Sequence, residues 1–355
     1  MIHNDPRSDS ASSILQCIER ARSVLIVVSR PVDPDCVGTA LAAQWWLAQQ
    51  GKQSCGVSFF EIPPSMHTFP DIDAIEVMPL ETFAFEPWNA IMLVDGSSWS
   101  QFFGLSWRDV IQHLDMNSII NIDHHQPDDI CAALSRRCLN RTTSSTAQLF
   151  YETFLAPFHI KPPARVAEYL YRALLYDTRH FRNEYHKGMY LFAEKLIELG
   201  VDHAQAVEVS YDRKVFDFFI WALTRTKYIA DIEATLLTIT DEDIRELERT
   251  FGPSWTDCDT VYKEVFLRQT EGYAYGLILT QNRDGTVKLS WRTRSTGNRV
   301  SIRRCATAAG FHAGGHYHAG GGVFYGSLRD AEQKLLAAIR EELATHRHLP
   351  HGTNG

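Results

Sequence analysis

Acidic and histidine side chains follow several short apolar segments of this sequence, and their types make them the first candidates for chemistry. Carboxylates that gather in one place repel each other unless cations neutralise them. Carboxylate oxygens mixed with one or two imidazoles suit Mn²⁺ or Mg²⁺ better than a structural zinc ion, which draws on cysteine. The set comprises Asp33, Asp35, Asp95, Asp123, His124, His125 and Asp177.

The elements that must position these residues alternate between strands and helices. Apolar runs over 23–28, 53–60, 90–95 and 118–123 predict short buried strands, separated by turn and helix signals. This alternation predicts βαβ units and a mostly parallel sheet. Because ligands bind outside the carboxyl ends of the strands in an open α/β sheet, we expect the acids and histidines to converge on one crevice.

The stretch VLIVVSRPVDPDCVGTALA, residues 24–42, concentrates this pattern. The apolar run predicts a strand that leads into a loop, and the loop holds Asp33 and Asp35. We expect the next helix to begin at Gly38, close behind the two acids, and to cover 38–51. One loop would thus present two carboxylates to the same site.

Taken singly, these residues have ordinary structural explanations. An aspartate after a strand is often only a turn former or a helix cap. For Asp95 alone, or for Asp177 at the end of a predicted helix over 162–178, that explanation would be the better one. The order and spacing of the whole set indicate a metal site instead. Two such ions, roughly 3.5–4 Å apart, activate water and stabilise the leaving oxygen in phosphoryl transfer.

The pattern changes in the second half of the chain. It is helical over about 195–230, which indicates a connecting region, and a strand is expected over 233–240. Two further strands flank an Asn-Arg-Asp-Gly turn, and a long helix follows. We therefore predict an α/β protein with a mostly parallel-sheet domain and a smaller α/β domain, joined by a helical linker. The predicted bounds are 1–195 for the first domain, 196–230 for the linker and 231–345 for the second domain.

Composition limits the classes of partner. The chain has 355 residues, 45% of them hydrophobic and 22% charged, which is enough for two domains with cores of their own. Its net charge of −8 argues against capture of long duplex nucleic acid. No apolar run approaches the roughly 20 residues of a membrane span. The polar N-terminus and seven scattered cysteines without a CxxC pair favour a cytoplasmic protein with reduced thiols.

Several segments, taken in order, resemble those of a known family. DPDCVG, LVDGS, NIDHHQ and LLYDTRHF are similar to the four motifs of the DHH phosphoesterase superfamily, and NIDHHQ contains its Asp-His-His at 123–125. FHAGGHYHAGGG at 311–322 is similar to the GGGHxxAAG signature of the DHHA1 domain, and KLSWRTR at 288–294 resembles the strand before it. The resemblance covers about 20–345. It points to the nanoRNases and related small phosphodiesterases rather than to RecJ-type exonucleases, exopolyphosphatases or cyclic-dinucleotide phosphodiesterases.

By position, the resemblance implies a centre for two Mn²⁺ or Mg²⁺ ions. His125 would face the scissile phosphate, and Asp123 would orient a histidine through its other ring nitrogen. The glycine-rich segment would bring backbone N–H groups close to an anion, although alone it indicates no more than a flexible loop. The implied ligands are Asp33, Asp95 and Asp177 for the first ion and Asp35, Asp95, His124 and Asp177 for the second, and the implied substrate-binding residues are Arg292, Gly314, Gly315 and His316.

Ser29 departs from the family pattern. The first motif usually reads HxxPDxD, and Ser29 stands at the histidine, with Val32 at the proline. A hydroxyl is a much poorer ligand than an imidazole, so three outcomes stay open: a weak first ion, a water in place of the imidazole, or loss of activity. The RecJ branch also lacks this histidine and is an active nuclease class, which favours activity.

The expected activity is hydrolysis of short oligoribonucleotides, or of a linear dinucleotide such as pGpG, to 5′-mononucleotides. One alternative is a phosphatase that acts on pAp or on polyphosphate. Another is a nucleotide-binding protein whose metal centre is weakened by Ser29. The apolar stretch KVFDFFIWALT, residues 214–224, suggests a homodimer contact or packing between domains.

Overall fold

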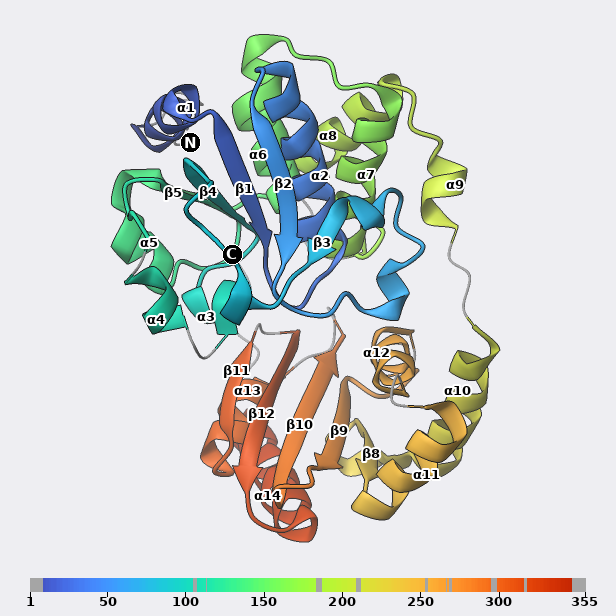
Figure 1. Ribbon diagram of the computed structural model, residues 1–355. Coiled ribbons are helices and arrows are strands. Elements are labelled where there is room, and N and C mark those ends of the chain that lie inside the picture. Colours follow the sequence, from blue (N-terminus) through green and yellow to red (C-terminus); the bar gives the residue numbers. More distant parts are fainter. Residues whose placement is uncertain are drawn as a thin grey trace. The chain divides into compact units, whose positions relative to one another are not determined.

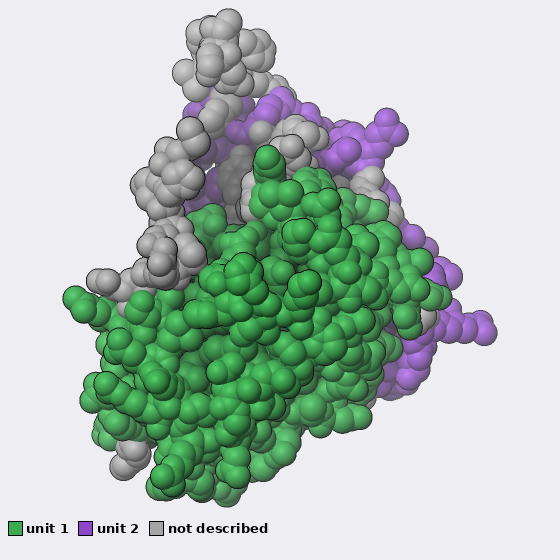
Figure 2. All heavy atoms as spheres, turned by 90° about the horizontal axis from the view of Figure 1, so that it is seen from above, with its two compact units in different colours: residues 1–209 green, residues 210–355 purple. Residues whose placement is uncertain are grey.

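The computed structural model divides the chain into two compact units, residues 1–209 and 210–355, which are coloured separately in Figure 2. Each unit contains one six-stranded sheet (Figure 1). The structure describes residues 9–104, 107–112, 114–182, 187–208, 212–252, 255–265, 267, 270–294, 299–315 and 318–346.

The sheet of the first unit is parallel throughout, in the order β3-β2-β1-β4-β5-β6. The chain runs outward from β1 to β3 and then returns to the other side of β1. This reversal between β1 and β4 is a topological switch point, where open α/β sheets bind their ligands. The strands are β1 (Ser23–Val28), β2 (Gln53–Ser58), β3 (Ile75–Val77), β4 (Ala90–Val94), β5 (Ile119–Asp123) and β6 (Cys138–Asn140).

Strand β1 shows how this sheet becomes a buried layer. All of its residues are buried, as expected for a strand covered on both faces. Ile26 belongs to a core shared with α2 (Pro34–Gln49) and α7 (Ala164–Asp177), whereas Leu25 belongs to a second core that contains Trp99. The remaining helices of the unit are α1 (Asp9–Arg20), α3 (Trp99–Phe103), α4 (Trp107–Ile111), α5 (Asp129–Leu134), α6 (Thr146–Phe150), α8 (Lys187–Glu198) and α9 (His203–Val207).

The helix after β1 begins earlier than predicted. It starts at Pro34 rather than at Gly38, so Asp33 is its N-cap and Asp35 lies in its first turn. The Asp33 carboxylate accepts hydrogen bonds from the backbone N–H of Asp35 and Cys36, at 2.9 and 3.1 Å. The Cys36 sulfur in turn accepts the Asp33 N–H at 3.2 Å. A cysteine thus takes the place of the usual glutamate or glutamine of a capping box, which hid the start from the sequence.

Gly38 serves helix packing and not a helix start. It lies within α2, where a Cβ would be 2.5 Å from the Tyr169 carbonyl oxygen and 3.2 Å from the Ala173 Cβ of α7. Only a residue without a side chain lets the two helices approach this closely. Since Asp177 is the last residue of α7 and Asp35 lies in the first turn of α2, this contact also brings two predicted ligands together.

The second unit contains a mixed sheet in the order β11-β12-β10-β9-β8-β7, antiparallel except for the pair β8 and β9. Its strands are β7 (Lys227–Ile229), β8 (Ala234–Ile239), β9 (Tyr275–Gln281), β10 (Thr286–Thr293), β11 (His312–Gly315) and β12 (Ala319–Tyr325). Its helices are α10 (Arg213–Arg225), α11 (Asp241–Phe251), α12 (Trp255–Val265), α13 (Ile302–Ala308) and α14 (Leu328–His346).

Different helices cover the two faces of this second sheet. Leu289 and Trp291 pack on one face with Ile302 of α13 and Leu335 of α14. Helices α10, α11 and α12 cover the other face over β8 and β9, where Ile278 joins their core. The predicted class, a mostly parallel α/β domain with a smaller α/β domain, is confirmed. The predicted linker, 196–230, contains the end of α8, all of α9 and α10, and β7.

The expectation that the cysteines are all reduced is wrong for one pair. Cys131 and Cys138 form a disulfide, with their Cα atoms 5.2 Å apart. The chain leaves α5, turns at Ser135 with a φ of 49°, and enters β6, which returns Cys138 to the side of Cys131. A spacing of seven residues carries no sequence signal for such a turn. The free cysteines are Cys17, Cys36, Cys55, Cys258 and Cys305.

The first turns of α10 expose apolar side chains. Phe216 is 53% exposed and Ile220 is 63% exposed, one helical turn apart on α10. They lie within the stretch from which a homodimer contact was expected, and that contact stays a prediction. None of the described helices combines the length and the apolar composition that a membrane span needs.

Replacing Gly38 with alanine tests the contact between α2 and α7. We expect Gly38→Ala to lower the free energy of unfolding by about 1–3 kcal/mol, because the new methyl overlaps the backbone of Tyr169. Urea unfolding measures the change. Gly314→Ala is the control, since a Cβ there meets no atom within 4 Å. An unchanged unfolding midpoint for Gly38→Ala would mean that α2 and α7 can move apart without loss of stability, and it would contradict this role of Gly38.

Candidate metal centre

The acids predicted to form the site lie at the carboxyl ends of three adjacent strands. Asp33 follows β1, Asp95 follows β4 and Asp123 ends β5, and these strands lie side by side. Asp95 has a φ of 65°, in the left-handed region, which turns the chain sharply away from the strand. The candidate site therefore lies at the topological switch point between β1 and β4, and at the carboxyl ends of the strands, where the sequence predicted that these residues would converge.

Backbone amides hold the Asp35 carboxylate in place. Asp35 is fully buried and accepts the N–H of Thr146 at 2.6 Å and of Ala147 at 3.0 Å, both at the start of α6. The Thr146 hydroxyl donates to Asp95 Oδ1 at 2.8 Å, so one residue orients two acids. Ser145 caps α6, and its hydroxyl accepts the Gln148 N–H at 3.1 Å. The role of Thr146 was missed because only the fold brings it to the acids.

His124 presents one ring nitrogen to the acids. Its Nδ1 lies 3.1 Å from the Thr143 carbonyl oxygen and donates to it, which leaves Nε2 as an acceptor. Nε2 is 3.0 Å from Asp177 Oδ2 and 3.9 Å from an oxygen of Asp35 and of Asp95. Although His124 Nε2 and Asp177 Oδ2 are this close, neither makes a well-formed hydrogen bond with any described residue. Two buried acceptors facing each other fit a cation between them.

Asp123 holds the second histidine. Its Oδ1 lies 2.8 Å from His125 Nδ1 and also accepts the His125 backbone N–H at 3.2 Å. Asn140 donates to Asp123 Oδ2 at 3.1 Å and to the His125 carbonyl oxygen at 2.9 Å. Asp123 is fully buried, whereas the His125 side chain is 33% exposed. This arrangement fixes the orientation of the His125 ring. No signal in the sequence pointed to Asn140.

The ligand atoms form three overlapping groups, each with its members within 4.8 Å of one another. Asp95 and His124 belong to two groups each, so neighbouring cation positions would share them. Cys36 joins one group and was not predicted. Among the described residues the groups are Asp35, His124 and Asp177; Asp95, His124 and His125; and Asp33, Cys36 and Asp95. Oxygen and imidazole donors dominate, a set that suits hard divalent cations such as Mn²⁺ and Mg²⁺.

The proximity of these acids changes their pKa values. Burial, and next the charge of Asp35, raise the pKa of Asp33 to about 6. The same two causes, in the same order, raise the pKa of Asp95 and of Asp177 well above the usual range. Burial lowers the pKa of His124, but the charges of Asp35 and Asp95 outweigh it and the net shift is upward. Positive charge at this site is therefore strongly favoured.

The segment after Asp177 has an unusual backbone. Arg179, His180 and Phe181 have φ values of 49°, 55° and 63°, and none of them is a glycine. The Thr178 hydroxyl accepts the Phe181 N–H at 3.2 Å and helps to hold this left-handed turn. The turn keeps Arg179 close enough to Asp177 for its charge to lower the pKa of that carboxyl, against the larger effect of burial. Strained backbone of this kind is common at functional sites.

Comparison with solved structures identifies the fold. An exopolyphosphatase-related protein from Bacteroides fragilis has a TM-score of 0.76 and 20% identity, covering 96% of this chain and 98% of that protein. RecJ from Thermus thermophilus in complex with Mn²⁺ has a TM-score of 0.52 and 12% identity, covering 97% of this chain and 55% of RecJ. The DHH domain of a member of a family of ribosomal proteins has a TM-score of 0.54 and 12% identity, covering 95% of this chain and 90% of that one. The chain has the fold of these proteins, one of which is a DHH domain. No protein-family model and no curated protein sequence matches it.

The DHH fold places the predicted residues of the second unit on two strands. Arg292 lies on β10, and its guanidinium donates to the carbonyl oxygen of Trp291 at 2.9 Å. Gly314 and Gly315 end β11. His316 lies outside the described residues. The roles of these residues, like those of the metal ligands, stay predictions.

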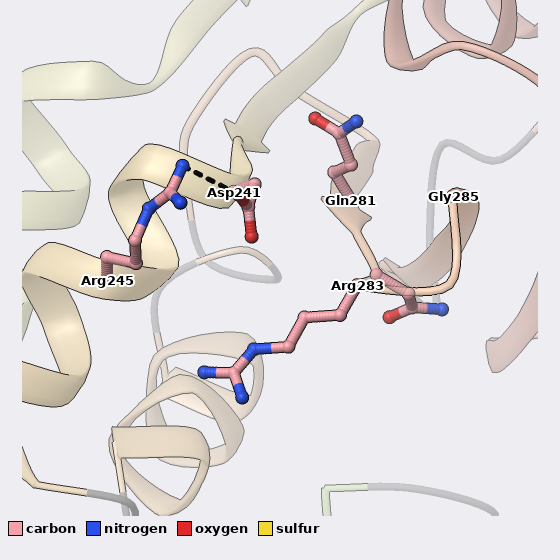
Figure 3. A pocket seen from close by; sticks show the side chains of 6 residues that line it. Asp241, Arg245, Gln281, Arg283 and Gly285 are labelled. Carbon is pink, nitrogen blue, oxygen red and sulfur yellow. Dashed lines mark ion pairs between the residues drawn. The ribbon is translucent and has the colours of Figure 1, made fainter.

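A pocket of about 410 Å³ lies elsewhere in this DHH-fold protein, between α11 and the turn that joins β9 to β10 (Figure 3). Arg245 pairs with Asp241 across one helical turn at 2.7 Å, and Arg283 pairs with Glu248. The charges that line the pocket are thus matched within the protein. The carboxylate and histidine cluster of the first unit is therefore the stronger candidate site.

The raised pKa values predict how the metal-free protein responds to pH. A carboxyl group whose pKa is raised by folding stabilises the fold below its unfolded pKa, and this stabilisation is lost as pH rises through the folded value. We therefore expect metal-free protein to become less stable as pH rises from about 4 through about 6, where Asp33 ionises, and to lose further stability above that as Asp95 and Asp177 ionise. Because Mn²⁺ must displace protons at low pH, it should stabilise more at pH 8 than at pH 5.5.

Thermal unfolding in EDTA and in Mn²⁺ at both pH values measures this effect. Asp95→Asn is the matched variant, because it keeps the shape and removes one titrating carboxylate, so the pH dependence should shrink. Equal stabilisation by Mn²⁺ at pH 5.5 and pH 8 would contradict the proposed cluster.

Ser29 allows a gain-of-ligand test. Ser29 is 2% exposed and directly follows β1, where the DHH family usually has a histidine. We expect Ser29→His to tighten the weaker of two Mn²⁺ sites by about tenfold or more, because imidazole replaces a hydroxyl. Isothermal titration with Mn²⁺ and no substrate measures this affinity. Ser29→Ala is the control, and identical titrations for the two variants would contradict the alignment of the first motif.

Proposed function

We propose that this protein is a metal-dependent phosphodiesterase that hydrolyses short oligoribonucleotides, or linear dinucleotides such as pGpG, to 5′-mononucleotides. The observation that carries the proposal is the sharing of Asp95 and His124 among adjacent groups of potential ligand atoms. Two neighbouring cations bridged by a common carboxylate are a common type of catalytic site for the cleavage of phosphate esters. The DHH fold supports a hydrolase of this class.

Five side chains would hold two cations. Asp33, Asp95 and Asp177 would contribute to the first position, and Asp35, Asp95, His124 and Asp177 to the second, with Asp95 and Asp177 shared. Among the described residues, Asp33 and Asp95 belong to one group of close ligand atoms, and Asp35, His124 and Asp177 form another. Such cations lower the pKa of a water molecule and neutralise charge that develops on the phosphate. Mn²⁺ and Mg²⁺ are the candidates, because oxygen donors dominate the set.

His125 would meet the substrate. Its Nδ1 is held by Asp123, so the ring is fixed and its Nε2 can donate to a phosphate oxygen or to the leaving oxygen. Burial lowers the pKa of His125, but its hydrogen bond to Asp123 and the charge of Asp95 outweigh burial and raise it. The upward shift of the His125 pKa favours the protonated ring, which suits a donor role. Asp123 acts through His125 as a positioning residue.

The second unit would supply a phosphate anchor. Arg292 offers a guanidinium fork, which matches the oxygens of a terminal phosphate. Gly314 has no structural need to be glycine, because its φ is not positive and a Cβ there meets no atom within 4 Å. A bare backbone at this point suits close approach of a ligand. An anchor that recognises a chain end favours short substrates, and Gly315 and His316 would complete it.

Two other functions compete with this proposal. A phosphatase acting on pAp or on polyphosphate would need the same cations, and the fold is shared with an exopolyphosphatase-related protein. A nucleotide-binding protein without turnover would follow if Ser29 weakened the centre too far. The complete set of acids and histidines favours an enzyme, since each of them is held by specific hydrogen bonds or close contacts.

Product analysis separates these functions. We expect wild-type protein with Mn²⁺ to convert pGpG and short RNAs to 5′-mononucleotides faster than it hydrolyses pAp or polyphosphate. His124→Ala removes a ligand and should lower kcat/KM at least about 100-fold, and Asp123→Ala should lower it about 10–100-fold through His125. His67→Ala and Asp73→Ala, at exposed positions in the same unit, are the matched controls.

The outcomes discriminate clearly. Turnover that survives in both His124→Ala and Asp123→Ala would overturn the proposed site. Faster hydrolysis of pAp or polyphosphate would support the phosphatase. Nucleotide binding without turnover at saturating Mn²⁺ would support the non-enzymatic function.

A further inference from the structure

A second pocket of the first unit lies at the amino-terminal ends of the strands, away from the candidate metal centre. Its volume is about 610 Å³, which is in the range of sites for small molecules. It is formed by α1 and by the residues that come just before β4, β5 and β6, among them Asn89, Ser118 and Arg137. Asp123 ends β5, so the length of that strand, roughly 15 Å, separates the pocket from the carboxylate and histidine cluster.

The pocket carries positive charge that the protein does not match. Arg20, Arg136 and Arg137 line it, against the single carboxylate of Asp115. None of these arginines forms an ion pair with a residue that the structure describes, whereas the arginines of the pocket in Figure 3 are each paired with an acid. Arg20 and Arg136 are exposed. The described lining therefore has a surplus of two positive charges, which favours an anionic ligand.

The neutral side chains of the pocket also offer donors more than acceptors. Asn117 Oδ1 accepts from Arg137 Nη1 at 3.2 Å, and Asn89 Oδ1 accepts the backbone N–H of Arg22 and of Ser23 at 3.0 and 3.2 Å. The oxygens of both amides are thus engaged within the protein, while neither NH₂ group donates to a described residue. Arg137 Nε is buried and likewise has no partner among the described residues. Unused donors of this kind suit an anion and not a cation.

Cys17 shows that two of the arginines converge on one point of the pocket. Burial raises the pKa of the Cys17 thiol, and the charges of Arg137 and Arg20 lower it in part. Arg20 comes from the last turn of α1, whereas Arg137 comes from the turn that leads into β6. Two guanidinium groups from separate elements therefore lie close to the same thiol, which also lines the pocket.

We propose that this pocket binds a small molecule that carries a chain of two or more phosphates. A surplus of two positive charges matches at least two negative charges, and guanidinium groups hold phosphate oxygens in pairs. None of the described residues that line the pocket is aromatic, so a base would have no ring on which to stack and the phosphates supply the recognition. The site is separate from that of the proposed phosphodiesterase reaction and does not depend on it.

Titration calorimetry of the full chain in EDTA tests the ligand class. The probes are inorganic phosphate, pyrophosphate, tripolyphosphate and ATP. We expect tripolyphosphate and pyrophosphate to bind at least about tenfold more tightly than phosphate, because only they span more than one guanidinium. Comparison of ATP with tripolyphosphate distinguishes the sources of the ligand: tighter binding of ATP indicates a nucleotide, and tighter binding of tripolyphosphate indicates a free polyphosphate. Either result supports the site.

Substitution of single arginines tests the location of the site. Arg20→Gln and Arg136→Gln should each weaken tripolyphosphate binding at least about fivefold without a change in thermal stability, since neither side chain bonds to a described residue. Arg22→Gln is the matched control, because Arg22 is exposed and lies two residues from Arg20 but does not line the pocket. Arg292→Gln removes the proposed phosphate anchor of the second unit and should leave this affinity unchanged.

Alkylation of Cys17 gives a second readout of occupancy. Cys17 and Cys55 are half-buried, whereas the free cysteines Cys36, Cys258 and Cys305 are buried. Saturating tripolyphosphate should slow the reaction of Cys17 with iodoacetamide at least about fivefold, as followed by mass spectrometry, and should not affect Cys55, which does not line the pocket.

Three results would overturn the site. The first is tripolyphosphate that binds no more tightly than phosphate. The second is an equal loss of affinity in Arg22→Gln and Arg136→Gln, which would indicate a general effect of charge. The third is an unchanged rate of Cys17 alkylation when tripolyphosphate is bound, which would place the ligand elsewhere.

Discussion

The structure of the first unit is organised around carboxylates that cannot all be ionised together without positive charge. Asp33, Asp35, Asp95 and Asp177 are drawn to one place by the ends of β1 and β4, the start of α2 and the end of α7. Burial removes the water that would screen them, so each raises the free energy of ionising the next. The raised pKa values of Asp33, Asp95 and Asp177 are the direct result. Such a cluster is costly for a fold unless a ligand compensates it.

The residues around this cluster fix the positions of its carboxylates more than they reduce the repulsion between them. Asp35 accepts two backbone N–H groups of α6, and Thr146 links it to Asp95. The absence of a side chain at Gly38 lets α7 approach α2, which sets Asp177 beside Asp35 and His124. None of these contacts supplies a full positive charge. The protein therefore fixes the geometry of these carboxylates, which is the arrangement expected of a preorganised metal site.

The sequence predicted the strands and the identity of the acids well, because both depend on local pattern. The run 23–28 is a strand with the predicted bounds, since continuous apolar residues have no other stable use between turns. Prediction from the sequence failed where a tertiary contact determines the local structure. The start of α2 depends on the sulfur of Cys36, the need for Gly38 depends on α7, and the disulfide depends on the turn at Ser135. Thr146 and Asn140 likewise act on residues that are distant in sequence.

The two proposed cation positions would be unequal, because the first motif lacks the usual histidine. The position near β1 has Asp33 and Asp95 as its oxygen donors, and Ser29 stands where an imidazole would have completed it. Cys36 lies within reach, but its sulfur already accepts the Asp33 N–H, and burial together with the charge of Asp33 raises the pKa of its thiol. A neutral thiol is a weak ligand, because the thiolate is the form that binds metals. The other position has two carboxylates and an imidazole whose free nitrogen faces them. We therefore expect the second position to fill first, so that occupancy of the first would limit the fraction of protein with a complete centre.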